Sequence, residues 1–153
     1  MDEIDEAVNT IAENGVIDNY LEAIQKRLKD SKMPREYVEG TFWVARKSPS
    51  FILEKPNDVE KLYEPRVFLW FPHHLKKELK CPVCDSKKIE VKGFNTKPRA
   101  RRIIDIQDCF YLMTMRYRCL GSKGSHSFNG YDDRVVKQLD LRIQADFPAT
   151  LTY

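Results

Sequence analysis

The sequence predicts an α+β fold in which helices flank a central antiparallel β region. Three observations favour this class. Apolar residues recur at helical spacing near both ends, apolar and aromatic residues alternate in short runs between them, and prolines interrupt the chain repeatedly from residue 34 to residue 72. Apolar residues make up 42% of the 153 residues and charged residues 32%, which excludes a wholly disordered chain.

Residues 1–32 are expected to form an acidic helical hairpin. Ile4, Val8 and Ile11 lie at helical spacing, and Gly15 is a typical residue for the end of a helix. A second helix is expected from Asp18, an N-cap residue type. Its apolar stripe comprises Tyr20, Leu21, Ile24 and Leu28. Such a hairpin can cover the protein's own core, or it can be a separate module that binds a partner.

Residues 33–153 are expected to form an aromatic-rich β region with a C-terminal helix. Proline breaks helices and cannot donate a strand hydrogen bond, so residues 33–75 should contain short strands and loops. The expected core aromatics there are Trp43, Phe51, Phe68, Trp70 and Phe71. Stacking of nucleic-acid bases on exposed aromatics is the alternative role.

Three further strands are expected at residues 87–94, 101–106 and 109–119. In the longest, strand alternation places the odd-numbered residues from Cys109 to Cys119 together on the core side and turns Arg116 and Arg118 outward. After a turn at Asn129-Gly130, residues 132–147 are expected to form a helix that ends before Pro148. Its N-cap would be Asp132 or Asp133, with Val135 and Leu139 facing inward.

Four residues have the types and spacing of a metal site. Cys81 and Cys84 form a CxxC turn, from which two thiolates can bind one Zn²⁺ ion. Cys119 ends the longest predicted strand, and His126 follows it across a loop rich in glycine and serine. The expected site is therefore a structural Cys₃His zinc site. Cys109, His73 and His74 are the alternatives for the fourth ligand.

A structural metal also explains how so basic a segment could fold. A stretch of about 50 residues rich in lysine and arginine buries little apolar surface, and a closed four-ligand site stabilises the folded state directly. A redox role for the CxxC motif would require it to open a helix after a strand, whereas Pro82 and the residues after Cys84 favour a turn. The predicted fold is thus a zinc-ribbon-type antiparallel β hairpin or sheet, with an N-terminal helical hairpin and a C-terminal helix.

The same residues resemble a known family. The motifs are CPVC at residue 81, RRIIDIQDCFYLMTMRYRC at residue 101, SFNGYD at residue 127 and ADFPA at residue 145. Together they resemble a eukaryotic transposon-associated domain of unknown function that contains a zinc ribbon, over about residues 37–153. The resemblance implies Cys81, Cys84 and Cys119 as ligands. The family usually has another cysteine two residues after YRC, whereas this chain has a longer loop that leads to His126.

Charge is segregated along the chain, and this predicts a partner. Residues 1–30 contain eight acidic against three basic side chains, whereas residues 76–125 contain thirteen basic against five acidic ones. A basic face attracts polyanions. The residues expected to contact nucleic-acid phosphates are Lys97, Arg99, Arg101, Arg102, Arg116 and Arg118. A solvated surface without a ligand is the alternative interpretation of these charges.

We expect from these observations a zinc-binding, nucleic-acid-binding module of transposon-derived origin, with DNA as the partner and the nucleus as its location, or else the cytoplasm. The alternative is a protein-interaction or assembly module with a structural zinc, whose partner binds the N-terminal helices. No enzymatic activity is expected, because Asp105, Asp108, His73, His74 and Cys109 have no catalytic spacing. No run of about 18 apolar residues and no signal-peptide pattern is present, so no membrane partner is expected.

Overall fold

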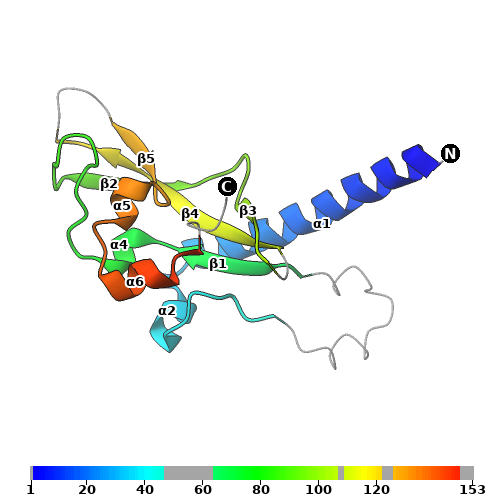
Figure 1. Ribbon diagram of the computed structural model, residues 1–153, viewed down its shortest axis with the longest axis horizontal. Helices are drawn as coiled ribbons and strands as arrows, with labels where there is room; N and C mark the ends of the chain where they lie inside the picture. Colours follow the sequence, from blue (N-terminus) through cyan, green and yellow to red (C-terminus); the bar gives the residue numbers. More distant parts are fainter. Residues whose placement is uncertain (1, 47–63, 107–108, 122–125, 149–153) are drawn as a thin grey trace. The chain divides into compact units, whose positions relative to one another are not determined.

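The computed structural model describes residues 2–46, 64–106, 109–121 and 126–148, and it describes only the backbone of residues 2–14. These residues confirm the α+β class, with helices and a five-stranded sheet (Figure 1). The chain divides into two compact units, Met1–Arg66 and Val67–Tyr153. No helix in the described ranges is long and apolar enough to cross a membrane. The predicted core residue Phe51 lies outside the described residues.

The N-terminal unit contains one long helix, α1 (Asp2–Lys29), and one short helix, α2 (Arg35–Glu39). The predicted hairpin is therefore wrong, because α1 continues through Gly15. That glycine does not adopt the positive φ that would end a helix, so it costs the helix stability without stopping it. Gly40, by contrast, has a φ of 82° and ends α2. The predicted stripe is buried at Leu21, Ile24 and Leu28.

An ion pair joins the two helices of the N-terminal unit. The guanidinium of Arg27 donates to both carboxylate oxygens of Glu36, whose side chain is only 4% exposed. Such a buried carboxylate requires a bidentate cationic partner. Burial, reinforced by Glu64, raises the pKa of Tyr20 in this unit to about 12.

Strand β4 (Cys109–Cys119) organises the sheet, and its bounds are those predicted. It pairs with β1 (Arg66–Trp70), β2 (Ile89–Phe94), β3 (Arg101–Ile104) and β5 (Ser127–Asn129). The pairs with β2, β3 and β5 are antiparallel. The first half of β4 pairs with β3, and the residues from Arg116 to Arg118 pair with both β2 and β5. The second half of β4 is therefore the centre of a three-stranded arrangement.

The predicted core face of β4 is correct for only half of the strand. Towards its end, Tyr117 and Cys119 are buried as expected. At its beginning, Phe110 and Leu112 are the buried residues, whereas Cys109 is only half-buried. Around Thr114 both faces are buried, so a single inward face could not be assigned by alternation.

Buried aromatic residues form the core of the C-terminal unit. Trp70 is fully buried, packs against the tilted ring of Phe147 with 4.4 Å between ring centroids, and donates from Nε1 to the Gly130 carbonyl. The Thr114 hydroxyl donates to the Trp70 carbonyl at 2.6 Å. Phe68 and Phe71 are buried as predicted, so these aromatics pack the core and do not form an exposed stacking surface.

Three short helices follow the strands of this unit: α4 (Pro72–Leu75), α5 (Asp133–Val136) and α6 (Leu141–Asp146). The predicted single C-terminal helix is wrong, because the chain starts a second helix after Leu139. The side chain of Asp132 caps α5, as expected, and that of Asp140 caps α6 by accepting from the Arg142 N–H. The second cap explains why the helix is interrupted.

Candidate metal centre and basic groove

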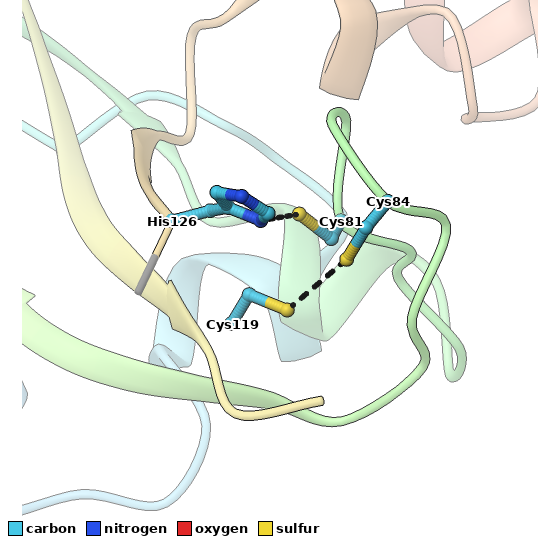
Figure 2. Close-up of side chains that lie close together, drawn as sticks. All are labelled: Cys81, Cys84, Cys119 and His126. Carbon is cyan, nitrogen blue, oxygen red and sulfur yellow. Dashed lines mark hydrogen bonds between the residues drawn. The ribbon is translucent and has the colours of Figure 1, made fainter. Parts of the chain in front are cut away.

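Four side chains converge at one end of the C-terminal unit. One ligand atom each from Cys81, Cys84, Cys119 and His126 lies within 4.8 Å of the other three (Figure 2). The sulfur of Cys81 is 3.5 Å from Nδ1 of His126, and the sulfurs of Cys84 and Cys119 are 3.5 Å apart. A tetrahedron with bonds of about 2.3 Å to sulfur and about 2.0 Å to nitrogen has edges of about 3.5–3.8 Å. The cluster could therefore hold a metal ion, and its donor set is typical of zinc.

A tight turn presents the first two thiols. The Cys81 N–H donates to the Ser86 carbonyl at 2.9 Å, and the Asp85 N–H donates to the Cys81 carbonyl at 3.0 Å. Asp85 has a φ of 58°, which reverses the chain after Cys84. The Val83 N–H also points at the sulfur of Cys81. Backbone donors at a sulfur stabilise a thiolate, the form that binds metal.

Pairing of β4 with β5 presents the other two side chains. Cys119 is the last residue of β4, His126 directly precedes β5, and the Cys119 N–H donates to the His126 carbonyl at 2.8 Å. The Leu120 N–H donates to the Lys88 carbonyl, which ties this strand end to the residues after the first turn. A side chain at Gly121 would collide with Ser86, so the two ligand-bearing turns are in direct contact.

The four cysteines of the chain are free thiols, and those of the cluster differ in acidity. A hydrogen bond from the Gly121 N–H lowers the pKa of Cys119. At Cys84 the Ser86 N–H acts in the same direction, but desolvation and the neighbouring thiols outweigh it and raise the pKa. Neighbouring thiolates repel one another, so the three thiols cannot all be ionised at neutral pH without a bound cation. Metal binding there would therefore release protons.

The alternative ligands lie elsewhere. Nδ1 of His73 is 2.7 Å from the hydroxyl of Tyr117, and burial, reinforced by His74, lowers the pKa of His73 to about 4. Cys109 lies ten residues before Cys119 on the same strand, which separates the two by about 30 Å. His126 is therefore the residue that the structure places with the three cysteines.

The six basic residues predicted to contact phosphates do not share one face. Three of them, Lys97, Arg101 and Arg116, line a groove of about 360 Å³. Its other lining residues are Phe94, Asn95, Thr96, Pro98, Asn129 and Tyr131. Among the described residues, no acidic side chain lines the groove, and none forms an ion pair with its three cations. The groove is therefore a concentrated positive site.

The other three basic residues have different surroundings. Arg118 pairs with Glu90 at 2.6 Å, with both side chains more than 40% exposed. Arg102 follows Arg101 in β3 and so points to the opposite face, where a hydrogen bond to the Cys109 thiol raises its pKa. Arg99 is half-buried and interacts with other residues of the chain.

Strand register creates the groove. Arg116 is paired with Gly93 of β2 on one side and with Asn129 of β5 on the other. A bulge lies between Val91 and Gly93, and Gly93 has a φ of 127°, a conformation that favours glycine. A Cβ at residue 93 would have no atom within 4 Å other than those of its neighbours in the chain, so the backbone conformation, and not a lack of space, favours glycine there. Phe94, Asn129 and Tyr131 were not identified from the sequence as groove residues. The available signal was a neighbouring glycine: Gly93 precedes Phe94, and Gly130 lies between Asn129 and Tyr131.

Comparison with known proteins gives a family without an assigned activity. Residues 17–153 match the family described as Domain of unknown function (DUF6729). The match begins within α1, whereas the resemblance in the sequence predicted a start near residue 37. No curated protein and no solved structure matches the chain.

Proposed function

This chain belongs to the family Domain of unknown function (DUF6729), and we propose that it is a nucleic-acid-binding module whose binding surface is stabilised by a structural zinc ion. The observation that carries the proposal is the groove, which is lined by three cations and, within the described part of the chain, by no acidic side chain. Arg116, in the groove, precedes the ligand Cys119 by three residues on β4. A metal that fixes the end of β4 would therefore also fix the position of this cation.

The ligand set supports a structural zinc in a zinc-ribbon-like arrangement. Three thiolates and one imidazole fill a tetrahedral shell, so no position is left for an activated water. The second half of β4 with β2 and β5 supplies the three-stranded part of such a ribbon. Catalysis by the metal is for this reason not part of the proposal.

The cations support binding to a phosphate backbone. Lys97, Arg101 and Arg116 come from the loop after β2, from β3 and from β4, so tertiary structure gathers them at one place. Each contact with a phosphate releases a counterion, which makes affinity fall with salt. DNA as the nucleic acid, a transposon-derived origin and a nuclear location are proposed from the resemblance in the sequence.

A matched pair of variants tests this function. Fluorescence anisotropy would measure binding of the zinc-loaded protein to random-sequence DNA between 50 and 200 mM salt. The triple variant Lys97→Gln, Arg101→Gln, Arg116→Gln should reduce the slope of log K against log salt by about 2–3. The control Lys77→Gln, Lys137→Gln, Arg142→Gln removes three exposed charges outside the groove and should change the slope little. Equal effects of both variants, or no binding by the wild type at low salt, would contradict the proposal.

A protein-interaction module is the second candidate. In the N-terminal unit Val38 is 76% exposed and Met33 is 43% exposed, although both are apolar. Apolar side chains on a surface favour a protein partner. Substitution of Met33 and Val38 by serine separates the candidates, since loss of a protein partner with retained DNA affinity assigns the two functions to different units.

A further inference from the structure

Aromatic rings stand beside the cations in the groove. Phe94 and Tyr131 line it, and both are half-buried. The rings of Phe94 and Phe71 form a T-shaped pair with centroids 5.9 Å apart, which restrains the ring of Phe94. The guanidinium of Arg101 lies over the ring of Tyr131, 5.5 Å from its centroid, so it restrains that ring and covers one of its two faces. The groove thus combines positive charge with two positioned aromatic side chains.

The size of the groove restricts what can use both features. Its volume of about 360 Å³ lies near the lower end of the range of about 300–1,000 Å³ for ligand sites. An intact duplex presents phosphates on its surface but keeps the faces of its bases inside the stack, away from Phe94 and Tyr131. An unpaired nucleotide presents a phosphate and a free base face together.

From this combination we propose that the groove binds one unpaired nucleotide of a single-stranded nucleic acid, an inference that rests on the proposed function. Lys97, Arg101 and Arg116 hold the flanking phosphates, and the base stacks on Phe94 and on the face of Tyr131 that Arg101 does not cover.

The side chain of Asn129 also lines the groove, but its Oδ1 is buried and accepts no hydrogen bond from the described residues, so this oxygen is not available to a bound base. Stacking with so few polar groups gives binding that tolerates many sequences, as in other single-strand sites.

The test compares two labelled oligonucleotides of equal length and charge, one of twelve deoxythymidines and one of twelve abasic residues. The full-length, zinc-loaded wild type should bind the thymidine strand at least tenfold more tightly. Tyr131→Leu and Phe94→Leu should each weaken thymidine binding by about 5- to 150-fold and weaken abasic binding much less. Tyr131→Phe retains the ring and should keep the preference.

The outcomes separate this inference from the proposed function. Equal affinity of the wild type for the two strands means that the groove binds phosphates only, which overturns the inference and leaves nucleic-acid binding intact. A duplex that binds as tightly as the thymidine strand also overturns it. If neither strand nor duplex binds at low salt, the proposed function fails. If a leucine variant does not fold, the ratio of the wild-type affinities for the thymidine strand and the abasic strand still tests the inference.

Discussion

A methyl group at residue 121 is expected to push apart the two turns that carry the metal ligands. In Gly121→Ala, the new Cβ would lie 2.7 Å from the Cβ of Ser86 and closer still to its Oγ. Ordinary carbon–carbon contacts are about 3.5–4.0 Å, so the turns must separate by about 1 Å. The Oγ can rotate away, but the Cβ of Ser86 is fixed by the backbone of the first turn.

The size of the effect follows from that displacement. Overpacking of a close contact costs about 1–3 kcal/mol, and disturbance of groups that orient metal ligands costs about 10- to 100-fold in metal affinity. A tenfold change in affinity corresponds to about 1.4 kcal/mol, so the expected loss of metal affinity lies within the range of the overpacking cost. We therefore expect the Kd for zinc to rise by about 10- to 100-fold, as measured by competition with a chromophoric chelator.

A second variant identifies Ser86 as the cause. Ser86→Gly removes both colliding atoms, along with the hydrogen bond that its Oγ accepts from the Lys88 N–H. In a double-mutant cycle, Ser86→Gly should recover most of the zinc affinity lost in Gly121→Ala, with a coupling energy of about 1–2 kcal/mol. Wild-type affinity in Gly121→Ala, or no recovery in the double variant, would refute the described contact between the turns.

Three further predictions concern stability. Because burial lowers the pKa of His73 to about 4, its ring stays neutral in the folded state while the unfolded chain takes up a proton below about pH 6.5. Between pH 7.5 and 4.5, urea unfolding should therefore show the wild type losing up to about 3 kcal/mol more stability than His73→Gln, in which no such group titrates; equal losses would contradict this. Gly15→Ala should stabilise α1 by up to about 1 kcal/mol in thermal unfolding followed by circular dichroism, whereas a helix that ended at this glycine would be destabilised. Glu36→Ala removes the buried partner of Arg27 and should lower the free energy of unfolding by about 1–3 kcal/mol in urea, and a change near zero would mean that this pair contributes nothing.

The strands were more predictable than the helix ends. The bounds of β4 follow from a run of eleven residues that contains Phe110, Tyr111, Thr114 and Tyr117 and no glycine or proline, and this signal is local. Its buried face changes along the strand because different strands pair with its two halves, and such pairing is not encoded in alternation. The helix ends at Gly15 and Asp140 were predicted wrongly because a single residue type does not determine where a helix ends. Gly15 does not end α1, and Asp140 caps a new helix after the buried Leu139.

The two halves of the metal cluster could be predicted because the spacing within each is local: two residues separate Cys81 from Cys84, and one loop joins the strand end at Cys119 to His126. The groove could not be predicted, because it depends on register. The pairing of β4 with β5 places Arg116 beside Asn129, and both residues line the groove together with Lys97 and Arg101. The sequence indicated the basic residues but could not show that Arg118 is paired with Glu90.

The metal centre is tested most directly by X-ray absorption at the zinc edge, together with metal analysis of purified, folded protein. The account predicts one zinc per chain, with three sulfur ligands at about 2.3 Å and one nitrogen ligand at about 2.0 Å. Folded protein without stoichiometric metal, or a zinc shell made of oxygen and nitrogen atoms, would contradict it.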